Sequence, residues 1–237
     1  MKKAIILAAG SGIRLRKYHS QPKCLLKFGN KKITIIQRLY DILKKKNILD
    51  IVIVTGYKSK LIKKHFGKRV RYINYKNYKK NNNLQSLLLA KKEIEGDFLC
   101  FFSDLIFDEI IIDKILKKKS DYCLAVDTGK VLESTMRIKK SKNKITDIGN
   151  HLSVANGDGN FIGISKFSNK GASLFKKYLI KENKNRKDYY TIVFKKMAND
   201  GIIVNFFDCK KYFWKEIDTY KDLCGMKKII KKKVFKY

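Results

Sequence analysis

Short apolar runs alternate with segments of helical periodicity along the first half of the chain. The continuous apolar runs predict buried strands at residues 4–8, 50–55, 70–74, 97–102 and 122–126. Between them, apolar side chains recur at helical spacing, which predicts helices at residues 33–46, 58–66, 84–94 and 110–118. Asn83 is placed to cap the third of these helices. This order predicts an α/β fold with a doubly wound, mostly parallel sheet that helices cover on both faces.

The second half of the chain has a different pattern. The segment MRIKKSKNKITDIG predicts a small β-hairpin that turns at residues 141–143. Further strands are predicted at residues 159–167 and 202–207, and further helices at residues 174–181, 190–197 and 220–232. No repeat, linker or low-complexity segment separates the two halves. We therefore predict a single domain over residues 1–237, with one half at residues 1–127 and another at residues 128–237 that carries the hairpin as a lid insertion.

The composition is that of a folded protein. Of the 237 residues, 44% are hydrophobic and 12% aromatic, and no apolar run reaches the roughly 20 residues of a membrane span. The opening MKKAIILAAGSG has an apolar stretch too short for a signal peptide, and a charged loop follows it. The five cysteines are odd in number and form no CxxC pair, which argues against a disulfide framework or a zinc site. We expect a soluble cytoplasmic protein that does not contact membranes.

The charge is strongly positive, with 55 Lys and Arg against 21 Asp and Glu and a formal net charge of +34. Such a balance is typical of proteins that bind nucleic acids or anionic membranes. However, the lysines are spread along the whole chain, and neither an RNA-binding aromatic signature nor a Cys/His finger accompanies them. We therefore interpret the charge as compositional and expect no nucleic-acid partner. A positive field still suits small anionic substrates.

One segment of the first half points to phosphate chemistry. The strand at residues 4–8 leads into LAAGSGIRL, and RKYHSQ and PKCLL follow. Glycines after a strand let backbone N–H groups approach a phosphate. The Walker pattern GxxxxGK[ST] is absent, and the dinucleotide pattern GxGxxG fails because Leu15 stands at its third glycine position. A plain strand-to-helix turn would leave Arg14, Arg16 and Lys23 without a role.

The full string resembles the signature of the sugar-phosphate and phosphocholine nucleotidyltransferases, which is LAAGxGxRL, a short loop and PK. The segment NNLQSL is similar to the NNxxSL of the small phosphocholine cytidylyltransferase-like branch. The family usually has proline and threonine in the loop, where this chain has Lys17 and His19 and a shorter loop. The resemblance covers most of the chain. It implies a Rossmann-like nucleotidyltransferase fold in which residues 1–127 bind a nucleotide and residues 128–237 bind an acceptor.

The resemblance also implies roles for individual residues. Asp104 in FLCFFSD and Asp218 in FWKEIDTYKDL take the positions of the family's magnesium ligands, so Mg²⁺ is the expected cofactor. Arg14 would bind the leaving phosphates, and Lys23 would neutralise charge on the α-phosphate. The residues expected to bind the nucleotide are Leu7, Ala9, Gly10, Ser11, Gly12, Asn82, Asn83, Gln85 and Ser86.

The implied reaction moves CMP from CTP to a small phosphorylated acceptor, phosphocholine- or phosphoglutamine-like, for the decoration of cell-surface polysaccharide. The attacking phosphate is already an anion, so positioning and charge neutralisation are sufficient. Gln85 would pair with the edge of cytosine, which offers an amino donor and a ring-nitrogen acceptor. The enzyme is expected to be a monomer or a homodimer. The candidates for the acceptor wall are Glu133, Arg137, Tyr189, Tyr190 and Trp214.

Three alternatives stay open at the level of the sequence. A sugar-1-phosphate nucleotidyltransferase would use UTP, dTTP or GTP. A sugar transferase normally holds its metal with a DxD motif, and SDLIFD around Asp104 lacks that pair. A basic nucleic-acid-binding module explains the charge but gives no role to Asp104, Asp218 or the glycine segment.

Overall fold

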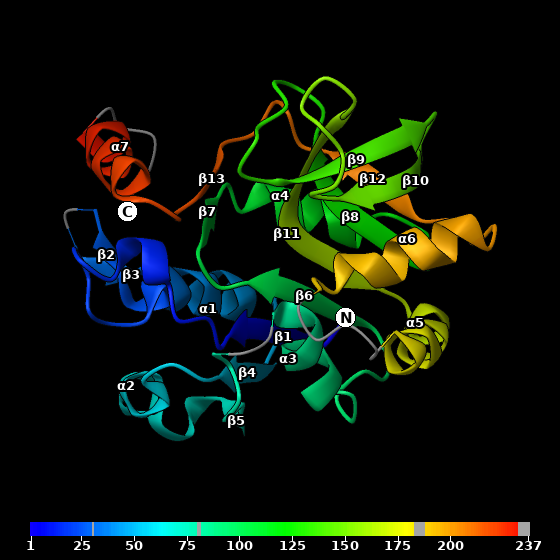
Figure 1. Cartoon of the computed structure of the whole chain (residues 1–237). Coiled ribbons are helices and arrows are strands. Elements are labelled where there is room, and N and C mark those ends of the chain that lie inside the picture. The colour runs from blue at the N-terminus through cyan, green and yellow to red at the C-terminus, as the bar shows by residue number, and fades with distance from the viewer. Residues whose placement is uncertain (30, 80–81, 183–187, 232–237) are drawn as a thin grey trace.

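The computed structural model describes residues 1–29, 31–79, 82–182 and 188–231. Within these ranges a nine-stranded sheet runs through the molecule in the order β5-β4-β1-β6-β11-β8-β12-β10-β9 (Figure 1). The strands of the first half are β1 (Lys3–Ala8), β4 (Asp50–Thr55), β5 (Arg71–Asn74) and β6 (Phe98–Phe102). Those of the second half are β8 (Tyr122–Asp127), β9 (Met136–Ser141), β10 (Lys144–Gly149), β11 (Gly159–Phe167) and β12 (Asn205–Asp208). The predicted α/β class is confirmed.

Strand direction changes along this sheet. β1 is parallel to both β4 and β6, and β4 is parallel to β5. β11 is antiparallel to β6 and β8, whereas β12 is parallel to β8. The sheet is therefore mixed rather than mostly parallel, because the predicted hairpin of β9 and β10 reverses the chain within a tight turn. β9 also pairs with β11. This end of the sheet is therefore a closed ring of paired strands, made of β11, β8, β12, β10 and β9.

Helices cover both faces of the sheet, as predicted. One face carries α1 (Ile35–Lys45), α2 (Ser59–Phe66) and α4 (Ile110–Leu116), and the other carries α3 (Asn83–Leu89), α5 (Asn169–Lys181) and α6 (Thr191–Asn199). Side chains of β1 alternate between these layers: Ala4 and Ile6 pack on the first, and Ile5 and Leu7 on the second. No helix in the described ranges combines the length and the apolar character that a membrane span requires.

Several predicted helices differ in their bounds: the helix expected from residue 174 begins at Asn169, and two further differences follow from capping. The helix expected at residues 84–94 begins at Asn83 and ends at Leu89, and its cap is Asn82, whose side chain accepts a hydrogen bond from the Asn83 backbone N–H at 2.9 Å. The prediction that Asn83 is the cap was wrong by one position. The helix expected from residue 33 begins at Ile35, because the Thr34 hydroxyl accepts from the Gln37 N–H at 3.1 Å and ends the preceding strand.

Four short strands were not predicted: β2 (Lys27–Phe28), β3 (Ile33–Thr34), β7 (Leu105–Phe107) and β13 (Trp214–Glu216). β7 pairs with β13 and β2 pairs with β3, apart from the main sheet. The last helix, α7 (Tyr220–Lys231), follows β13; residue 232 of its predicted span lies outside the described residues. A small apolar cluster joins these parts to the segment after β1, and its buried members are Leu15, Leu26, Ile35, Ile106 and Ile217. It brings residues 214–218 close to the start of the chain.

Candidate active site

The glycine segment follows the carboxyl end of β1. Gly12 has a φ of +57°, in the left-handed region that favours glycine. A Cβ at this position would lie 2.7 Å from Cγ of Lys23, so the missing side chain is also the space through which the lysine stem passes. Next to Gly10 the corresponding space is open. The sequence of this loop therefore fixes both its backbone shape and the path of Lys23.

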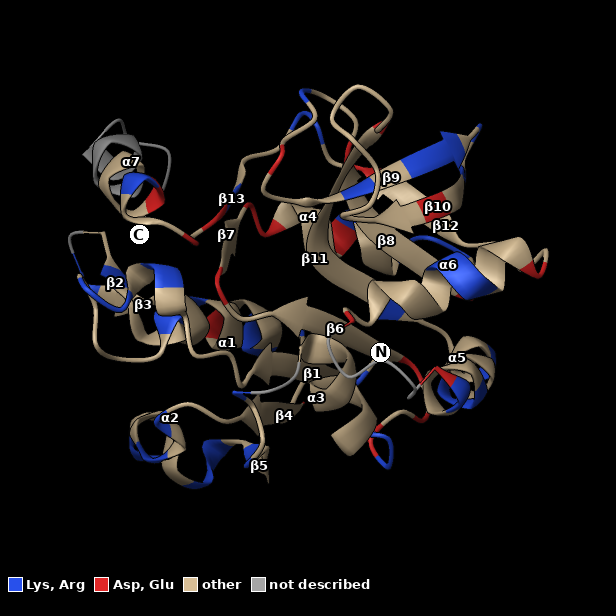
Figure 2. Ribbon diagram, in the orientation of Figure 1, with Lys and Arg blue, Asp and Glu red and all other residues tan. Residues whose placement is uncertain are grey.

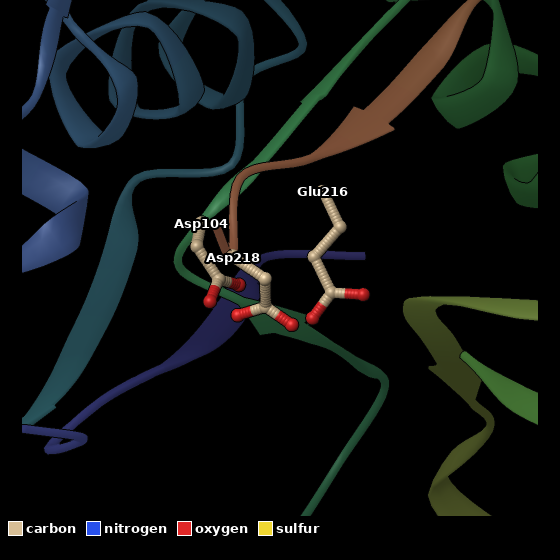
Figure 3. Close-up of side chains that lie close together, drawn as sticks. All are labelled: Asp104, Glu216 and Asp218. Atoms are coloured by element: carbon tan, nitrogen blue, oxygen red, sulfur yellow. The ribbon is translucent and has the colours of Figure 1, made fainter. Parts of the chain in front are cut away.

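Three carboxylates meet beside this loop. Asp104 lies in the turn between β6 and β7, Glu216 ends β13, and Asp218 follows two residues later. The pairing of β7 with β13 sets Leu105 level with Glu216, and the Ile217 N–H donates to the Asp104 carbonyl at 3.0 Å. One carboxylate oxygen from each residue lies within 4.8 Å of the others, and Figure 3 shows the three side chains converging. We call this the carboxylate cluster.

Two cations neutralise part of the carboxylate cluster. The Lys23 ammonium lies 2.5 Å from Oδ2 of Asp104 and also contacts Oδ1 of Asp218. Nη2 of Arg14 donates to Oδ2 of Asp218 at 2.7 Å. The side chain of Lys23 is 17% exposed, and that of Arg14 is 61% exposed. Arg14 thus faces solvent from the rim of the site, while Lys23 lies within it.

The pKa values of Lys23 and Glu216 reflect this crowding. Burial opposes the charged ammonium of Lys23, but Asp104 and Asp218 outweigh it and raise its pKa. Burial, together with the charges of Asp104 and Asp218, raises the pKa of Glu216 well above the usual range of a glutamate. The charged form of Glu216 is therefore disfavoured beside the two aspartates, whose charges Lys23 and Arg14 already balance.

The carboxylate cluster fits a hard divalent cation. Its donors are all carboxylate oxygens, which Mg²⁺ and similar ions prefer, and they converge on one point. The ammonium of Lys23 already shows that a cation is stable between Asp104 and Asp218. Asp104, Glu216 and Asp218 are the residues that would hold the ion.

A cavity of about 580 Å³ opens above the glycine segment and the carboxylate cluster. It reaches from the end of β1 to the N-terminus of α3 and to the start of α6. The predicted site residues that line it are Leu7, Ala9, Gly10, Ser11, Gly12, Arg14, Lys23, Asn82, Asn83, Ser86, Asp104, Tyr189 and Asp218. One cavity thus brings together the residues predicted to bind a nucleotide and those predicted to hold a metal.

Gln85 and Glu133 do not contribute to this lining. Gln85 lies on the first turn of α3, where Asn83 and Ser86 are three positions apart and share the face toward the cavity. Gln85 stands two positions after Asn83, which turns it away from that face. Glu133 is exposed in the loop before β9.

Arg137, Tyr190 and Trp214 also lie outside the main cavity. The guanidinium of buried Arg137 donates to the backbone carbonyls of Leu132 and Glu133, in the loop before β9, and of Asn150 and Leu152, in the loop after β10. The hydroxyl of buried Tyr190 is hydrogen-bonded to Ser165 at 2.9 Å. Trp214 donates from Nε1 to Asp127 at 2.8 Å and lines a second cavity of about 210 Å³, which shares Ser134, Glu216 and Asp218 with the first.

Several cavity residues were missed from the sequence. Glu216 was not predicted to bind the metal, yet Trp214, Glu216 and Asp218 alternate in WKEID as side chains on one face of a strand do. That alternation was a usable signal. Other lining residues carried no comparable local pattern, among them Tyr78, Lys79, Phe102, Ser103, Ser134, Met136 and Phe161.

Comparisons with known proteins agree with this geometry. A CTP:phosphoglutamine cytidylyltransferase of Campylobacter jejuni is 27% identical over 93% of this chain and 97% of its own. A choline-phosphate cytidylyltransferase of Streptococcus pneumoniae is 36% identical over 44% of this chain and 46% of its own.

Among solved structures, the CTP:phosphocholine cytidylyltransferase of Streptococcus pneumoniae shares the fold, with a TM-score of 0.81 at 23% identity over 97% of this chain and 100% of that one. These two sequence relatives carry the name cytidylyltransferase. Residues 3–144 match the family described as nucleotidyl transferase. This chain is therefore a nucleotidyltransferase and belongs to that family.

Proposed function

We propose that this enzyme transfers CMP from CTP to a small phosphorylated acceptor and releases pyrophosphate. The observation that carries the proposal is the single cavity in which the glycine loop, Lys23, Arg14 and the carboxylate cluster face one another. One relative, which covers 93% of the chain, is named for CTP and phosphoglutamine, and another, which covers 44% of it, is named a choline-phosphate cytidylyltransferase; these two names support both the base and the acceptor class. A role in decorating cell-surface polysaccharide is part of this proposal.

The residues divide the work of the reaction. An oxygen of the acceptor phosphate forms a bond to the α-phosphorus, and the bond from that phosphorus to the bridging oxygen breaks as pyrophosphate leaves. Backbone N–H groups of residues 10–12 and the exposed guanidinium of Arg14 would bind the departing phosphates. Lys23 would neutralise the charge that grows on the α-phosphate.

A divalent ion, which nucleotidyltransferases of this family typically use, supplies charge neutralisation between phosphates. We propose Mg²⁺ for this site, because all three donors are carboxylates. Asp104, Glu216 and Asp218 would hold it. The second cavity, next to Trp214 and Glu216, offers room for the organic part of the acceptor.

Base recognition falls to the N-terminus of α3 and the end of β1. Ser86 is only 5% exposed and lines the cavity, so its hydroxyl would face the base from a desolvated position. Asn82 and the backbone of Leu7 and Ala9 lie along the same wall. A site that hydrogen-bonds one base leaves polar groups unpaired with another, at about 1–3 kcal/mol each.

The test is pyrophosphate release with CTP, UTP, ATP, GTP and dTTP, each combined with phosphocholine, phosphoglutamine and sugar 1-phosphates in the presence of Mg²⁺. We expect kcat/KM to be highest for CTP with a phosphorylated amine or amino acid, by roughly tenfold or more for each lost hydrogen bond. If UTP, dTTP or GTP with a sugar 1-phosphate gave the highest kcat/KM, the enzyme would be a sugar-1-phosphate nucleotidyltransferase instead.

A further inference from the structure

Two tyrosines stack on each other at the rim of the candidate active site. The rings of Tyr18 and Tyr220 have centroids 4.1 Å apart and planes inclined by 23°. The two residues are 59% and 47% exposed, so the stack is a surface contact and not part of the core. Neither tyrosine lines either of the two cavities. The stack joins the segment that carries Arg14 to the first residue of α7.

Arg14 has little of its own to hold it in place. Its side chain is 61% exposed, and among the described residues its guanidinium pairs with Asp218 alone, at 2.7 Å. Ion pairs this exposed hold a long side chain only weakly. The position of the guanidinium therefore depends on where the backbone of its own segment lies relative to Asp218, which stands two positions before Tyr220.

The backbone from Arg14 to the stack is a run of tight turns. The Leu15 N–H donates to the Gly12 carbonyl at 3.0 Å, and the Tyr18 N–H donates to the Leu15 carbonyl at 2.9 Å. Because each turn is closed by a hydrogen bond, a displacement of Tyr18 also displaces Arg14. The two contacts with residues 218–220, one through the guanidinium and one through the ring of Tyr18, thus support each other.

A third tyrosine holds the far end of this segment. The hydroxyl of Tyr57 donates to the Ser20 carbonyl at 3.0 Å, and the guanidinium of Arg16 lies 5.1 Å from the centre of the Tyr57 ring. The segment has Lys17 and His19 where the family usually has proline and threonine. A proline would fix one backbone dihedral, so without it the segment depends more on contacts with other parts of the chain.

We propose that Tyr18 and Tyr220 are positioning residues for Arg14. Their stack fixes the turn segment against the start of α7 and keeps the guanidinium directed at the place where the departing phosphates bind. Without the stack, Arg14 stays in the chain but samples other positions, so phosphates bind more weakly. The inference rests on the proposed function for the identity of these phosphates, whereas the link between the stack and the turn segment is independent of it.

Inorganic pyrophosphate is the probe, and its affinity is measured by isothermal titration calorimetry. We expect Arg14→Ala to weaken binding by at least about tenfold and Tyr220→Ala by about three- to tenfold. Tyr220→Phe should stay within about twofold of wild type, because phenylalanine keeps the stacking ring. Unchanged affinity in Arg14→Ala or in Tyr220→Ala, or a loss in Tyr220→Phe equal to that in Tyr220→Ala, would overturn the proposal.

The double variant Arg14→Ala/Tyr220→Ala separates positioning from a general structural role. If the tyrosine acts through the arginine, adding Tyr220→Ala to Arg14→Ala should weaken binding by less than about twofold further. A further loss as large as that of Tyr220→Ala alone would show that Tyr220 acts independently of Arg14 and would overturn the proposal.

Hydrogen exchange measured by mass spectrometry tests the mechanical link with no ligand present. We expect the amides of residues 12–20 to exchange at least about threefold faster in Tyr18→Ala and in Tyr220→Ala than in wild type. Tyr18→Ala removes the other ring of the stack and serves alone if Tyr220→Ala does not fold. Wild-type exchange in these variants would overturn the proposal.

Tyr72→Ala is the matched control. Tyr72 lies on β5 and lines neither cavity, and its hydroxyl donates to the Gly67 carbonyl at 2.7 Å. Pyrophosphate affinity and exchange of residues 12–20 should keep their wild-type values in this variant, and changes as large as in Tyr220→Ala would overturn the proposal. If wild type released no pyrophosphate from any nucleotide, the proposed function would fail, and faster exchange in Tyr220→Ala would still support the link.

Discussion

Gly12 shows how much of the site depends on the absence of one methyl group. The residue combines a left-handed backbone with a gap that the stem of Lys23 fills, so alanine would introduce two separate costs. The left-handed conformation alone costs roughly 1–2 kcal/mol for a residue with a Cβ. The contact at 2.7 Å adds a displacement of Lys23 from the carboxylate cluster.

We therefore predict that Gly12→Ala lowers kcat by at least about tenfold, because a misplaced catalytic group costs more than its strain alone. The matched control is Gly201→Ala at the end of α6, where φ is +78° and no atom lies within 4 Å of the added Cβ. Steady-state kinetics and urea unfolding of both variants separate the two costs. If Gly12→Ala and Gly201→Ala lost the same stability and both kept a near-normal kcat, the path of Lys23 would not matter for catalysis.

At this scale, the sequence allowed prediction of the residues that belong to one contiguous motif. Residues 10–12, Arg14 and Lys23 stand within 14 positions of each other, and the family signature that this segment resembles placed them in one site. Gln85, which was predicted to bind the nucleotide, does not line the cavity, because helical phase, not sequence proximity to Asn83 and Ser86, decides which side chains share a face. The environment of Arg137 could not be foreseen, because its partners are backbone carbonyls of loops whose paths no local pattern encodes.

The pair β7 and β13 is the element that assembles the carboxylate cluster. Each strand has only three residues, and their pairing joins segments more than 100 positions apart in the chain. The three residues of β7 offer too few positions for alternation to be recognised, whereas the alternation that continues from β13 to Asp218 was a signal that could have been used. The runs at residues 50–55 and 159–167 were predicted with correct bounds, because continuous apolar strands in the interior of a sheet carry a strong signal.

The predicted helix at residues 84–94 was too long for a related reason. Ile94 is buried in the same core cluster as Leu84 and Leu87, so the apolar spacing continues beyond the last helical residue. Residues 90–93 form a turn and do not continue the helix, and this turn places Ile94 in the core. Periodicity reports burial, and it reports the backbone only indirectly.

Asp222, in the first turn of α7, holds the backbone of Asp218 in place. One oxygen of Asp222 accepts from the N–H groups of Asp218 and Thr219 and from the Thr219 hydroxyl, at 3.2, 2.9 and 2.8 Å. The Asp222 N–H donates back to the Thr219 hydroxyl at 3.3 Å, which completes a reciprocal cap. Burial opposes ionisation here, but Lys215 and Thr219 outweigh it and lower the pKa of Asp222.

A lowered pKa makes this cap sensitive to acid. Its stabilisation is fully present above the unfolded-state pKa of about 3.9 and is lost as the pH falls through the lower folded-state value. We predict that Asp222→Asn costs on the order of 1 kcal/mol at neutral pH and that the difference from wild type shrinks below about pH 4. Urea unfolding across this range measures it. A difference that stays constant with pH would show that the charge of Asp222 contributes nothing to the cap.

On the scale of the whole molecule, the positive charge is distributed rather than concentrated. Figure 2 shows Lys and Arg on helices and strands of both halves, with Asp and Glu in smaller numbers between them. At a formal net charge of +34, repulsion among these groups opposes the compact state. Raising the ionic strength from about 0.01 M to about 0.15 M shortens the Debye length from about 30 Å to about 8 Å.

We predict that the Tm rises over this range of NaCl concentration, by about 2–4 °C for each kcal/mol of repulsion that is screened. Differential scanning calorimetry in chloride salts is the measurement, because sulfate or phosphate could occupy the glycine loop and stabilise the fold by binding. KCl in place of NaCl serves as the control for a specific cation effect. A Tm that falls as NaCl is added would mean that attractive ion pairs outweigh the repulsion.

The place of β11 in the sheet has a consequence for how the chain acquires its structure during synthesis. Residues 159–167 insert between β6 and β8, so Phe98–Phe102 has a partner on one edge only until a segment some 60 positions later is available. A nascent chain that has emerged as far as β8 carries an open, wholly apolar strand edge, the kind of surface on which chains aggregate. The sheet of the first half is therefore complete at this edge only after β11 has left the ribosome and has paired with both β6 and β8.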